Sequence, residues 1–309
     1  MPTVTLAKHA MATRFELVLH GADACALRAA GEAALAEVER VENQLSLYRP
    51  GSEIAQLNAR AAREPVRVSP EVLALLQHAA RLAAETEGAF DITIAPLVKC
   101  WGFMNASGHL PTPEAISAAR AVVGMQNVLC DVAERTICFA QPGVMLDLGA
   151  IGKGYAIERG AEILREAGVS SALFHGGTST VCAIGHPPDA EHWLVALPPL
   201  PGTPASGRPV ASNQTLKLRD ESVSVSAIWG RAFESGGKTF GHVIDPRLGE
   251  PVTNAQLSAI ILPSATETDA LSTALLTLGP AGHAKIHRLR PGMRSLIIDA
   301  NGVMQSLPA

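Results

Sequence analysis

A glycine-rich segment in the middle of the chain has the composition of a phosphate-binding turn. An apolar run over residues 144–148 is followed by three glycines and Lys153, and then by apolar residues at helical spacing. We therefore expect a buried strand that turns at the glycines and enters a helix. Glycines let backbone N–H groups approach an anion closely, a helix N-terminus adds a partial positive charge, and Lys153 adds a full one. The segment matches neither common glycine-rich phosphate motif, so a tight turn with a surface lysine is an equally valid interpretation.

A second candidate site lies near the C-terminus, where Asp269 and Thr273 are four residues apart in a segment with helical periodicity. Residues at this spacing share one face of a helix, so their side-chain oxygens could bind one hard cation. Two oxygen ligands leave positions for water and phosphate oxygens, as magnesium prefers. The alternative is that Asp269 is a solvated residue near a helix start.

His242 lies three residues before Asp245, in a short predicted strand that leads into a proline and glycine turn. A histidine in this position could act as a general base or could donate a structural hydrogen bond. The chain has ten histidines, and most histidines in proteins are structural, so both interpretations stay open.

Caps and periodicity predict the elements that must position these residues. We expect helices where a capping residue or an N-terminal proline precedes apolar residues at helical spacing. They cover residues 23–44, a short segment after Ser52, 69–87, a segment after Thr112, the segment after Lys153, and 264–278. Alternating or apolar runs predict strands at 14–20, 128–130, 136–139, 172–181, 193–197, 221–226, 257–262, 294–298 and 303–307. The irregular order of helices and strands indicates an α+β fold of mixed sheets with surrounding helices, in a single domain over residues 1–309.

Two surface features are also expected. Residues 198–209 are rich in Pro, Gly and Ser, which predicts a mobile loop within the domain. The outer face of the first helix carries charged side chains that we expect to be solvated: Glu32, Glu37, Glu39, Arg40 and Glu42.

Composition excludes several classes of protein. The formal net charge of −4 over 309 residues provides no basic surface for nucleic acid. No apolar run reaches the roughly 18 residues of a membrane span, and the first residues lack the apolar segment of an export signal, so we expect a cytoplasmic protein unless a leader was removed. The five cysteines are scattered and never in C-x-x-C spacing, which predicts free thiols rather than disulfides or a zinc site.

Taken together, these motifs resemble the FAD:protein FMN transferase (ApbE) family. The resemblance is carried by Met11-Ala12-Thr13, Ser52-Glu53 with Leu57-Asn58, Phe90-Asp91 with Thr93 and Pro96-Leu97, Trp101-Gly102-Phe103, the stretch from Asp147 to Ala156, Gly176-Gly177, His242-Val243-Ile244-Asp245-Pro246 with Gly249 and Pro251, and Asp269-Ala270-Leu271 with Thr273. The motifs occur in the family's order and cover nearly the whole chain. As a set they are highly specific.

The resemblance implies an enzyme that uses FAD as substrate and Mg²⁺ as cofactor, and transfers FMN to a threonine or serine hydroxyl of an acceptor flavoprotein with release of AMP. It implies that the cation is held by Asp269, Thr273 and the backbone carbonyl of Ala150, and that the catalytic groups are Lys153, His242 and Asp245. The residues that it places around FAD are Met11, Tyr48, Asn58, Asp91, Thr93, Asp147, Gly149, Lys153, Gly176, Gly177, Ser226 and His242.

Several of these roles leave alternatives. Asp147 could orient the glycine turn through backbone N–H groups or could touch the metal. Met11, Tyr48, Trp101 and Phe103 offer stacking surface for the isoalloxazine ring, although each could equally be a core residue.

The sequence departs from the family's usual pattern at Ala12, Gly152, Thr178 and Ala227. Loss of a glycine beside a cofactor can block close approach of the backbone. Two alternatives to FMN transfer therefore stay open. One is an FAD pyrophosphatase that yields FMN and AMP, and the other is a non-catalytic protein that binds or stores FAD.

Overall fold

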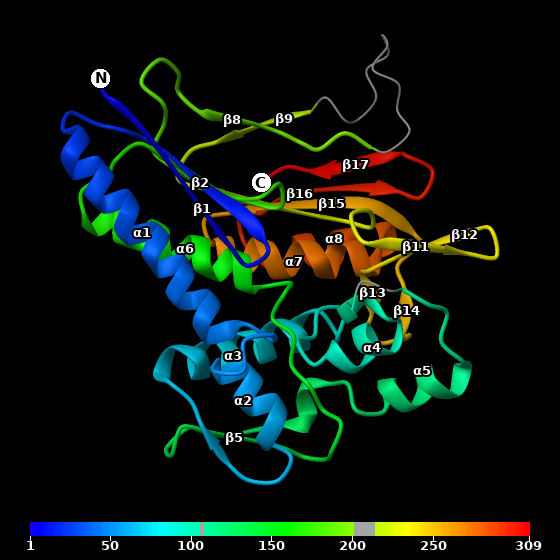
Figure 1. Cartoon of the computed structure of the whole chain (residues 1–309). Coiled ribbons are helices and arrows are strands. Elements are labelled where there is room, and N and C mark those ends of the chain that lie inside the picture. Colours follow the sequence, from blue (N-terminus) through cyan, green and yellow to red (C-terminus); the bar gives the residue numbers. More distant parts are fainter. Residues whose placement is uncertain (106–107, 201–213) are drawn as a thin grey trace.

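The computed structural model describes residues 1–105, 108–200 and 214–309, so most of the predicted loop at 198–209 lies outside the described residues. Its main feature is an eight-stranded sheet in which every neighbouring pair of strands is antiparallel (Figure 1). The spatial order is β1 (Thr3–Ala10), β2 (Thr13–His20), β6 (Ala172–Gly176), β7 (Thr180–Ile184), β10 (Ser222–Ala227), β15 (Ala255–Leu262), β16 (Arg294–Asp299) and β17 (Met304–Leu307). Together with the helices around it, this sheet confirms the predicted α+β fold.

Helices cover one face of the large sheet and a hairpin covers the other. The helices α1 (Ala24–Leu45), α6 (Gly152–Glu166) and α7 (Ala265–Leu278) pack against one another and against the sheet, below it in Figure 1. The hairpin of β8 (Trp193–Ala196) and β9 (Thr215–Leu218) lies over the opposite face, where it shares an apolar cluster with Val223 and Ile261.

A lower part of the molecule continues from this helical layer. It contains the helices α2 (Glu53–Arg60), α3 (Pro70–Glu85), α4 (Ala95–Cys100) and α5 (Pro113–Arg120), and a three-stranded sheet of β3 (Val66–Arg67), β5 (Thr136–Phe139) and β4 (Val128–Asp131). Two small hairpins, β11 (Ala232–Ser235) with β12 (Lys238–Gly241) and β13 (Ile244–Asp245) with β14 (Glu250–Pro251), share an apolar cluster with α4. The short helix α8 (His283–His287) follows α7. One continuous apolar cluster runs from the large sheet through the helices into the lower part.

The caps predicted from the sequence form at the helix starts. Asp23 accepts hydrogen bonds from Cys25 and Ala26 N–H, and Ser52, Ser69, Thr112 and Ser264 each accept one from the first turn of their helices. Each bond satisfies an N–H that a helix leaves without an internal partner. Within the described ranges, no helix combines the length and hydrophobicity that crossing a bilayer requires.

The strand predicted at residues 144–148 does not form. Val144, Leu146 and Leu148 are buried in alternation, but no neighbouring strand pairs with the segment. Instead, the Asn58 side chain donates to Leu146 O (2.9 Å) and accepts from Leu146 N–H (2.7 Å), and Asp147 N–H donates to Ile92 O (2.7 Å). An alternating pattern reports which residues are buried, whereas a strand also needs a partner chain, and here a side chain takes that place.

A layer of hydroxyl groups separates the large sheet from α7. Ser222, Ser224 and Ser226 alternate along β10 with valines that face the hairpin side. Ser224 Oγ lies 3.1 Å from Thr180 Oγ1 and 2.9 Å from Thr268 Oγ1. Because these side chains are small and mutually hydrogen-bonded, α7 packs closely on the sheet without leaving buried polar groups unpaired.

The helices α6 and α7 cap each other. Asp269, in the middle of α7, accepts a hydrogen bond from Gly154 N–H in the first turn of α6 (2.9 Å). Glu158, on α6, accepts from Ser264 Oγ and from Thr266 N–H at the start of α7 (2.7 Å each). This contact requires glycine at 154, because a Cβ there would overlap the Ala265 carbonyl oxygen and lie 2.7 Å from Asp269 Cβ.

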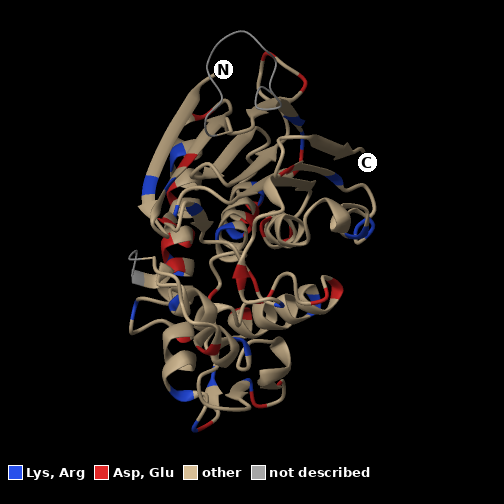
Figure 2. Cartoon of the chain, turned by 90° about the vertical axis from the view of Figure 1, so that its right-hand side faces the viewer, with Lys and Arg blue, Asp and Glu red and all other residues tan. Residues whose placement is uncertain are grey.

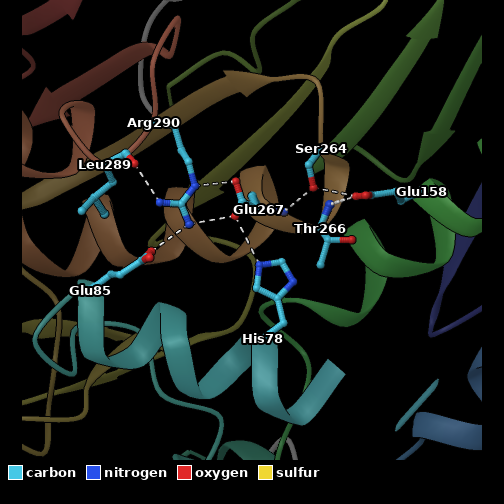
Figure 3. A network of polar contacts seen from close by, with 8 residues as sticks. All are labelled: His78, Glu85, Glu158, Ser264, Thr266, Glu267, Leu289 and Arg290. Atoms are coloured by element: carbon cyan, nitrogen blue, oxygen red, sulfur yellow. Dashed lines mark hydrogen bonds and ion pairs between the residues drawn. The ribbon is translucent and has the colours of Figure 1, made fainter. Parts of the chain in front are cut away.

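A partly buried ionic network ties α7 to α3 and to the segment after α8 (Figure 3). Arg290 donates to both carboxylate oxygens of Glu267 (2.8 Å each) and to Glu85 (2.8 Å), while His78 Nε2 lies 3.2 Å from Glu267 Oε1. Elsewhere, acidic and basic residues are intermingled over both halves of the molecule (Figure 2). The network differs from those surface charges because it joins helices from the upper and lower parts.

We predict that Glu267→Gln lowers stability by an amount that depends on pH. Burial raises the pKa of Glu267, but hydrogen bonds from His78 and Arg290 outweigh it and bring the pKa from 4.5 down to about 2. A carboxyl whose pKa is lowered by folding stabilises the protein above its unfolded pKa and loses that effect as the pH falls through its folded pKa. The unfolding free energy should therefore be about 3 kcal/mol lower in the variant at pH 7, with the difference shrinking as the pH falls from about 4.5 towards 2.

Denaturant unfolding at several pH values measures this difference. The control is Glu64→Gln, which breaks the solvent-exposed Arg60–Glu64 pair and should change stability by less than about 1 kcal/mol. Equal effects of the two variants at pH 7 would show that the network adds no more than a surface ion pair.

We also predict that Gly154→Ala destabilises the protein by about 1–3 kcal/mol, because the added methyl group forces α6 and α7 apart. Gly152→Ala is the matched control, since a Cβ at 152 would meet only Leu148 Cβ, at 4.0 Å, and should be neutral or slightly stabilising. Thermal unfolding compares them, and a Gly154→Ala variant as stable as Gly152→Ala would contradict the close approach.

Candidate functional site

Several of the predicted site residues lie at one end of the large sheet. The β1–β2 turn holds Met11 and Ala12 there. Gly176, the last residue of β6, and Gly177, in the β6–β7 turn, lie beside it. Gly177 N–H donates to Arg14 O (2.8 Å), and a Cβ on Gly177 would overlap Thr13 Oγ1. The two turns are therefore in direct contact.

This end of the sheet leads directly to the predicted metal residues. Val225 N–H donates to Ser179 O (2.7 Å), which joins the β6–β7 turn to the end of β10. The next residue, Ser226, has its Oγ 2.8 Å from Ser272 Oγ and 3.1 Å from Thr273 Oγ1 on α7. The structure thus brings Gly177, Ser226 and Thr273 together, although they are far apart in the sequence.

The start of α6 is suited to bind an anion. Ile151 at the N-cap gives no side-chain hydrogen bond, so the first turn is not neutralised by a cap of its own. Lys153 lies in this turn, and its Nζ donates to Gly149 O (3.1 Å). Two first-turn N–H groups have acceptors, since Gly152 N–H donates to Leu148 O and Gly154 N–H to Asp269. The positive charge at this end of α6 therefore comes from the helix dipole and Lys153.

Asp147 orients the glycine turn, which is one of its two predicted roles. Its Oδ1 accepts a hydrogen bond from Gly149 N–H (2.8 Å). Burial raises the pKa of this carboxyl, while the Gly149 N–H and the positive charges of Lys153 and Arg231 lower it. The carboxylate therefore lies within electrostatic range of two cationic side chains.

His242 is held so that one ring nitrogen can accept a proton. Both its backbone N–H (3.0 Å) and its Nδ1 (3.2 Å) bond to the carbonyl oxygen of Arg231. A carbonyl can only accept, so Nδ1 carries the proton and Nε2 has a free lone pair. Burial lowers the pKa of His242, the bond to Arg231 O opposes this, and the charges of Arg231 and Lys153 lower it further. The imidazole is therefore neutral at pH 7.

Arg231 is a site residue that the sequence did not reveal. Its guanidinium acts on both Asp147 and His242, and its carbonyl fixes the histidine ring. In the sequence, Arg231 comes just before the segment that forms the β11–β12 hairpin, and His242 comes just after it. The contact between Arg231 and His242 depends on the strand register of this hairpin, which could not be predicted from the sequence.

The predicted metal residues offer a donor set of oxygens. Asp269 is 4% exposed and uses Oδ2 for Gly154 N–H, and no hydrogen bond within the described residues reaches Oδ1. Thr273 lies one turn after Asp269 on α7, and its Oγ1 is 3.1 Å from Ser226 Oγ on β10. Ala150 is half-buried at the glycine turn. Among residues 1–105, 108–200 and 214–309, no group of three or more His, Cys, Asp or Glu side chains is arranged so that it could hold a metal ion. One carboxylate with neutral oxygens fits magnesium, which keeps water and phosphate ligands.

Asn58, Asp91 and Thr93 act on the backbone around the site. The Asn58 side chain forms the two bonds to Leu146 described above. Asp91 accepts from Thr93 N–H (2.8 Å), Thr93 Oγ1 (2.6 Å) and Met125 N–H (3.1 Å), and burial raises its pKa against these bonds. Their side chains therefore shape the loops that carry Ile92 and Asp147.

Glu42 joins Met11 to Arg49, which follows Tyr48 in the loop after α1. Glu42 accepts from Met11 N–H (2.8 Å) through one oxygen and from Arg49 Nη2 (2.7 Å) through the other. The expectation that Glu42 is merely solvated is therefore wrong, since it joins the β1–β2 turn to the loop after α1. Tyr48, in that loop, is 65% exposed, so its ring is available for stacking.

Ala12 keeps the turn that a glycine would form. It has a φ of 57°, in the left-handed region, and it is exposed. Such a conformation costs an alanine about 1 kcal/mol. The departure from the family pattern at this position therefore leaves the turn itself in place.

Asp245 and the two aromatic residues of the Trp-Gly-Phe motif are buried in supporting contacts. Asp245 binds Arg247 through both carboxylate oxygens (2.9 and 2.6 Å) and accepts Arg247 N–H (2.9 Å). Trp101 and Phe103 are core residues of one apolar cluster, which confirms the core interpretation for both.

Two cavities border these residues. One of about 450 Å³ lies between α3 and the Val123–Gln126 turn, and Asp91 is its one predicted flavin residue, whereas Lys153 and Asp269 do not line it. The other, of about 290 Å³, lies under the β8–β9 hairpin and includes Gly177 and Thr178. The second cavity therefore opens beside the end of the sheet where the site residues gather.

Comparisons with known proteins agree with this arrangement. A family model described as the ApbE family matches residues 11–297. A curated protein of Klebsiella pneumoniae (strain 342) named FAD:protein FMN transferase is 30% identical over 275 residues, which cover 87% of this chain and 77% of that protein. The protein of the same name from Escherichia coli (strain K12) is 28% identical, with 94% and 83% covered.

Solved structures give the same result. The ApbE protein of Thermotoga maritima superposes with a TM-score of 0.88 at 27% identity, covering 98% of this chain and 96% of the other. The apo form of the flavinyl transferase ApbE of Pseudomonas stutzeri gives a TM-score of 0.85 at 29% identity, with 99% and 94% covered. Because the family model and these relatives span most of its length, the chain belongs to the ApbE family.

Proposed function

We propose that the protein transfers FMN from FAD to a threonine or serine hydroxyl of an acceptor flavoprotein and releases AMP, in a reaction that depends on Mg²⁺. The observation that carries this proposal is the meeting of the electropositive start of α6 with Asp269 of α7, next to a neutral His242. The relatives named FAD:protein FMN transferase support the same reaction.

Mg²⁺ would be held by Asp269, Thr273 and the carbonyl oxygen of Ala150. When bound, it would neutralise negative charge on the pyrophosphate and on the departing AMP phosphate. The donor chemistry described above fits this ion.

The residues of the chain then have separate tasks. Lys153, at the positive end of the α6 dipole, binds pyrophosphate oxygens, and Arg231 adds a second positive charge nearby. His242 Nε2 accepts the proton of the acceptor hydroxyl as its oxygen bonds to the FMN phosphorus and the bond from that phosphorus to AMP breaks. Asp245 contributes by holding the turn after His242 through Arg247.

The flavin end of FAD would lie along the end of the sheet. Tyr48 and Met11 supply ring and thioether surface, while Gly176, Gly177 and Ser226 allow the backbone to approach closely. Asn58, Asp91 and Thr93 support this surface from behind, and Asp147 with Gly149 keeps the glycine turn open to the pyrophosphate.

One experiment tests the reaction itself. The protein is incubated with FAD, MgCl₂ and a candidate acceptor flavoprotein, and AMP release and in-gel flavin fluorescence of the acceptor are measured. We expect AMP together with a labelled acceptor, and no label when the reacting hydroxyl residue of the acceptor is replaced by alanine. AMP without label would instead indicate an FAD pyrophosphatase, and neither product would indicate an FAD-binding or storage protein.

The metal assignment predicts that Asp269→Asn lowers Mg²⁺-dependent AMP release by about two orders of magnitude or more, because the ion contributes several kcal/mol of charge stabilisation. The asparagine keeps an oxygen that can accept Gly154 N–H, so thermal stability should change little. Asp269→Ala should lose activity equally and also about 1 kcal/mol of stability, because the helix cap is lost. An Asp269→Asn variant with the Mg²⁺ dependence of the wild type, measured against EDTA-treated samples, would rule out Asp269 as a ligand.

A further inference from the structure

We propose that Trp101 is a positioning residue for His242, because it fixes the chain on both sides of the histidine. The proposal rests on the proposed function only in taking His242 as the general base. Trp101 belongs to the Trp-Gly-Phe motif, for which the site described above gives no role.

The first contact holds the chain after His242. The Trp101 indole Nε1 donates to Gly249 O (2.8 Å), and Gly249 N–H donates to Asp245 O (2.7 Å). Gly249 is the last residue of the turn that connects β13 to β14, and Ile244 in β13 packs in the same apolar cluster as Trp101. Trp101 therefore fixes the far end of the turn that begins three residues after the histidine.

The second contact holds the chain before His242. The Trp101 ring lies 5.6 Å from the ring of Phe240 and 6.4 Å from that of Phe233, measured between centroids. Phe233 and Phe240 form a cross-strand pair in the β11–β12 hairpin, and their rings stack at 5.3 Å. The stacked pair therefore fixes this hairpin against Trp101.

The hairpin in turn fixes the histidine ring. Phe233 follows Arg231 by two residues and Phe240 precedes His242 by two residues, so Arg231 and His242 meet at the base of the hairpin. There the Arg231 carbonyl receives both the backbone N–H and Nδ1 of His242. Because both bonds lie at the base of the hairpin, a movement of the hairpin relative to the turn at Gly249 would carry the histidine ring with it.

Trp101 is itself well anchored. It is 3% exposed, it lies at the end of α4, and it packs with Leu97 and Phe103. The position of the histidine is thus determined by a rigid aromatic cluster. The charged groups that act on the ring are Arg231, on the hairpin side, and Lys153, on α6, and Asp147 lies within range of both of these.

The test compares Trp101→Phe with Trp193→Phe. Both substitutions keep an aromatic ring and remove one buried indole hydrogen bond, since Trp193 is 8% exposed and donates to Ile184 O (3.3 Å) under the β8–β9 hairpin. For Trp101→Phe we expect kcat for AMP release from FAD and Mg²⁺ to fall about 10- to 100-fold with little change in KM for FAD, because small misplacements of a reacting group are costly. Trp193→Phe should leave kcat within about twofold.

A second readout does not depend on turnover. Burial lowers the pKa of His242, so a ring released from its place should titrate closer to the ordinary value. NMR titration of the His242 ring, and the acidic limb of the kcat profile, should therefore move to higher pH in Trp101→Phe and stay in place in Trp193→Phe.

The outcomes are decisive in either direction. An unchanged His242 titration in folded Trp101→Phe, or equal effects of the two substitutions, would overturn the proposal. If Trp101→Phe does not fold, Phe240→Leu replaces it, because that variant keeps the indole hydrogen bond and loses the ring contact, and the same shift is expected. Failure of the proposed function would appear separately, as absence of AMP from the wild-type protein, while the titration would still test the positioning.

Discussion

The site depends on one contact, the hydrogen bond from Gly154 N–H to the carboxylate of Asp269. It gives the start of α6 an acceptor from another helix, while Glu158 returns an acceptor to the start of α7. The two helices are thus locked in register by their own unsatisfied N–H groups, which are the groups that a helix end must otherwise leave to solvent. Because Asp269 is also the one carboxylate of the proposed metal site, helix packing and ion binding use the same side chain. A shift of α7 would therefore change both at once.

The layer of hydroxyl groups between α7 and the large sheet allows Asp269 to reach Gly154 N–H. Large apolar residues between a sheet and a helix hold the two apart, whereas the smaller serines and threonines permit a closer approach. Ser224, Ser226 and Ser258 bond to Thr180, Thr268, Ser272 and Thr273, so the polar atoms are paired and burial is tolerated. The same layer of hydrogen-bonded hydroxyl groups includes Thr273, a residue of the proposed metal site.

Features set by neighbouring residues were predicted well, and features set by distant partners were not. Capped helices such as 264–278 formed because Ser264 and Glu267 are close in sequence and the cap is a local interaction. The strand at 144–148 was wrong because its partner is the side chain of Asn58, 88 residues away. Glu42 was taken as solvated because its partner Met11 is 31 residues away. Motif spacing singled out Asp269, Lys153 and His242 as candidates, whereas Arg231 and the proposed role of Trp101 became apparent only with the register of the β11–β12 hairpin.

The residues proposed to bind the pyrophosphate and the proposed general base, His242, are held by different kinds of interaction, and the chemistry of each explains why. The pyrophosphate end needs positive charge, which the N-terminus of α6 and Lys153 supply, while the buried carboxylate of Asp269 is proposed to hold a cation there. The base must stay neutral at pH 7, and a negatively charged support would raise its pKa and keep its proton in place. Holding His242 with a backbone carbonyl and a cluster of aromatic rings avoids that effect. Burial and the charges of Arg231 and Lys153 lower its pKa instead, and the bond from Nδ1 to the Arg231 carbonyl leaves Nε2 free to accept a proton.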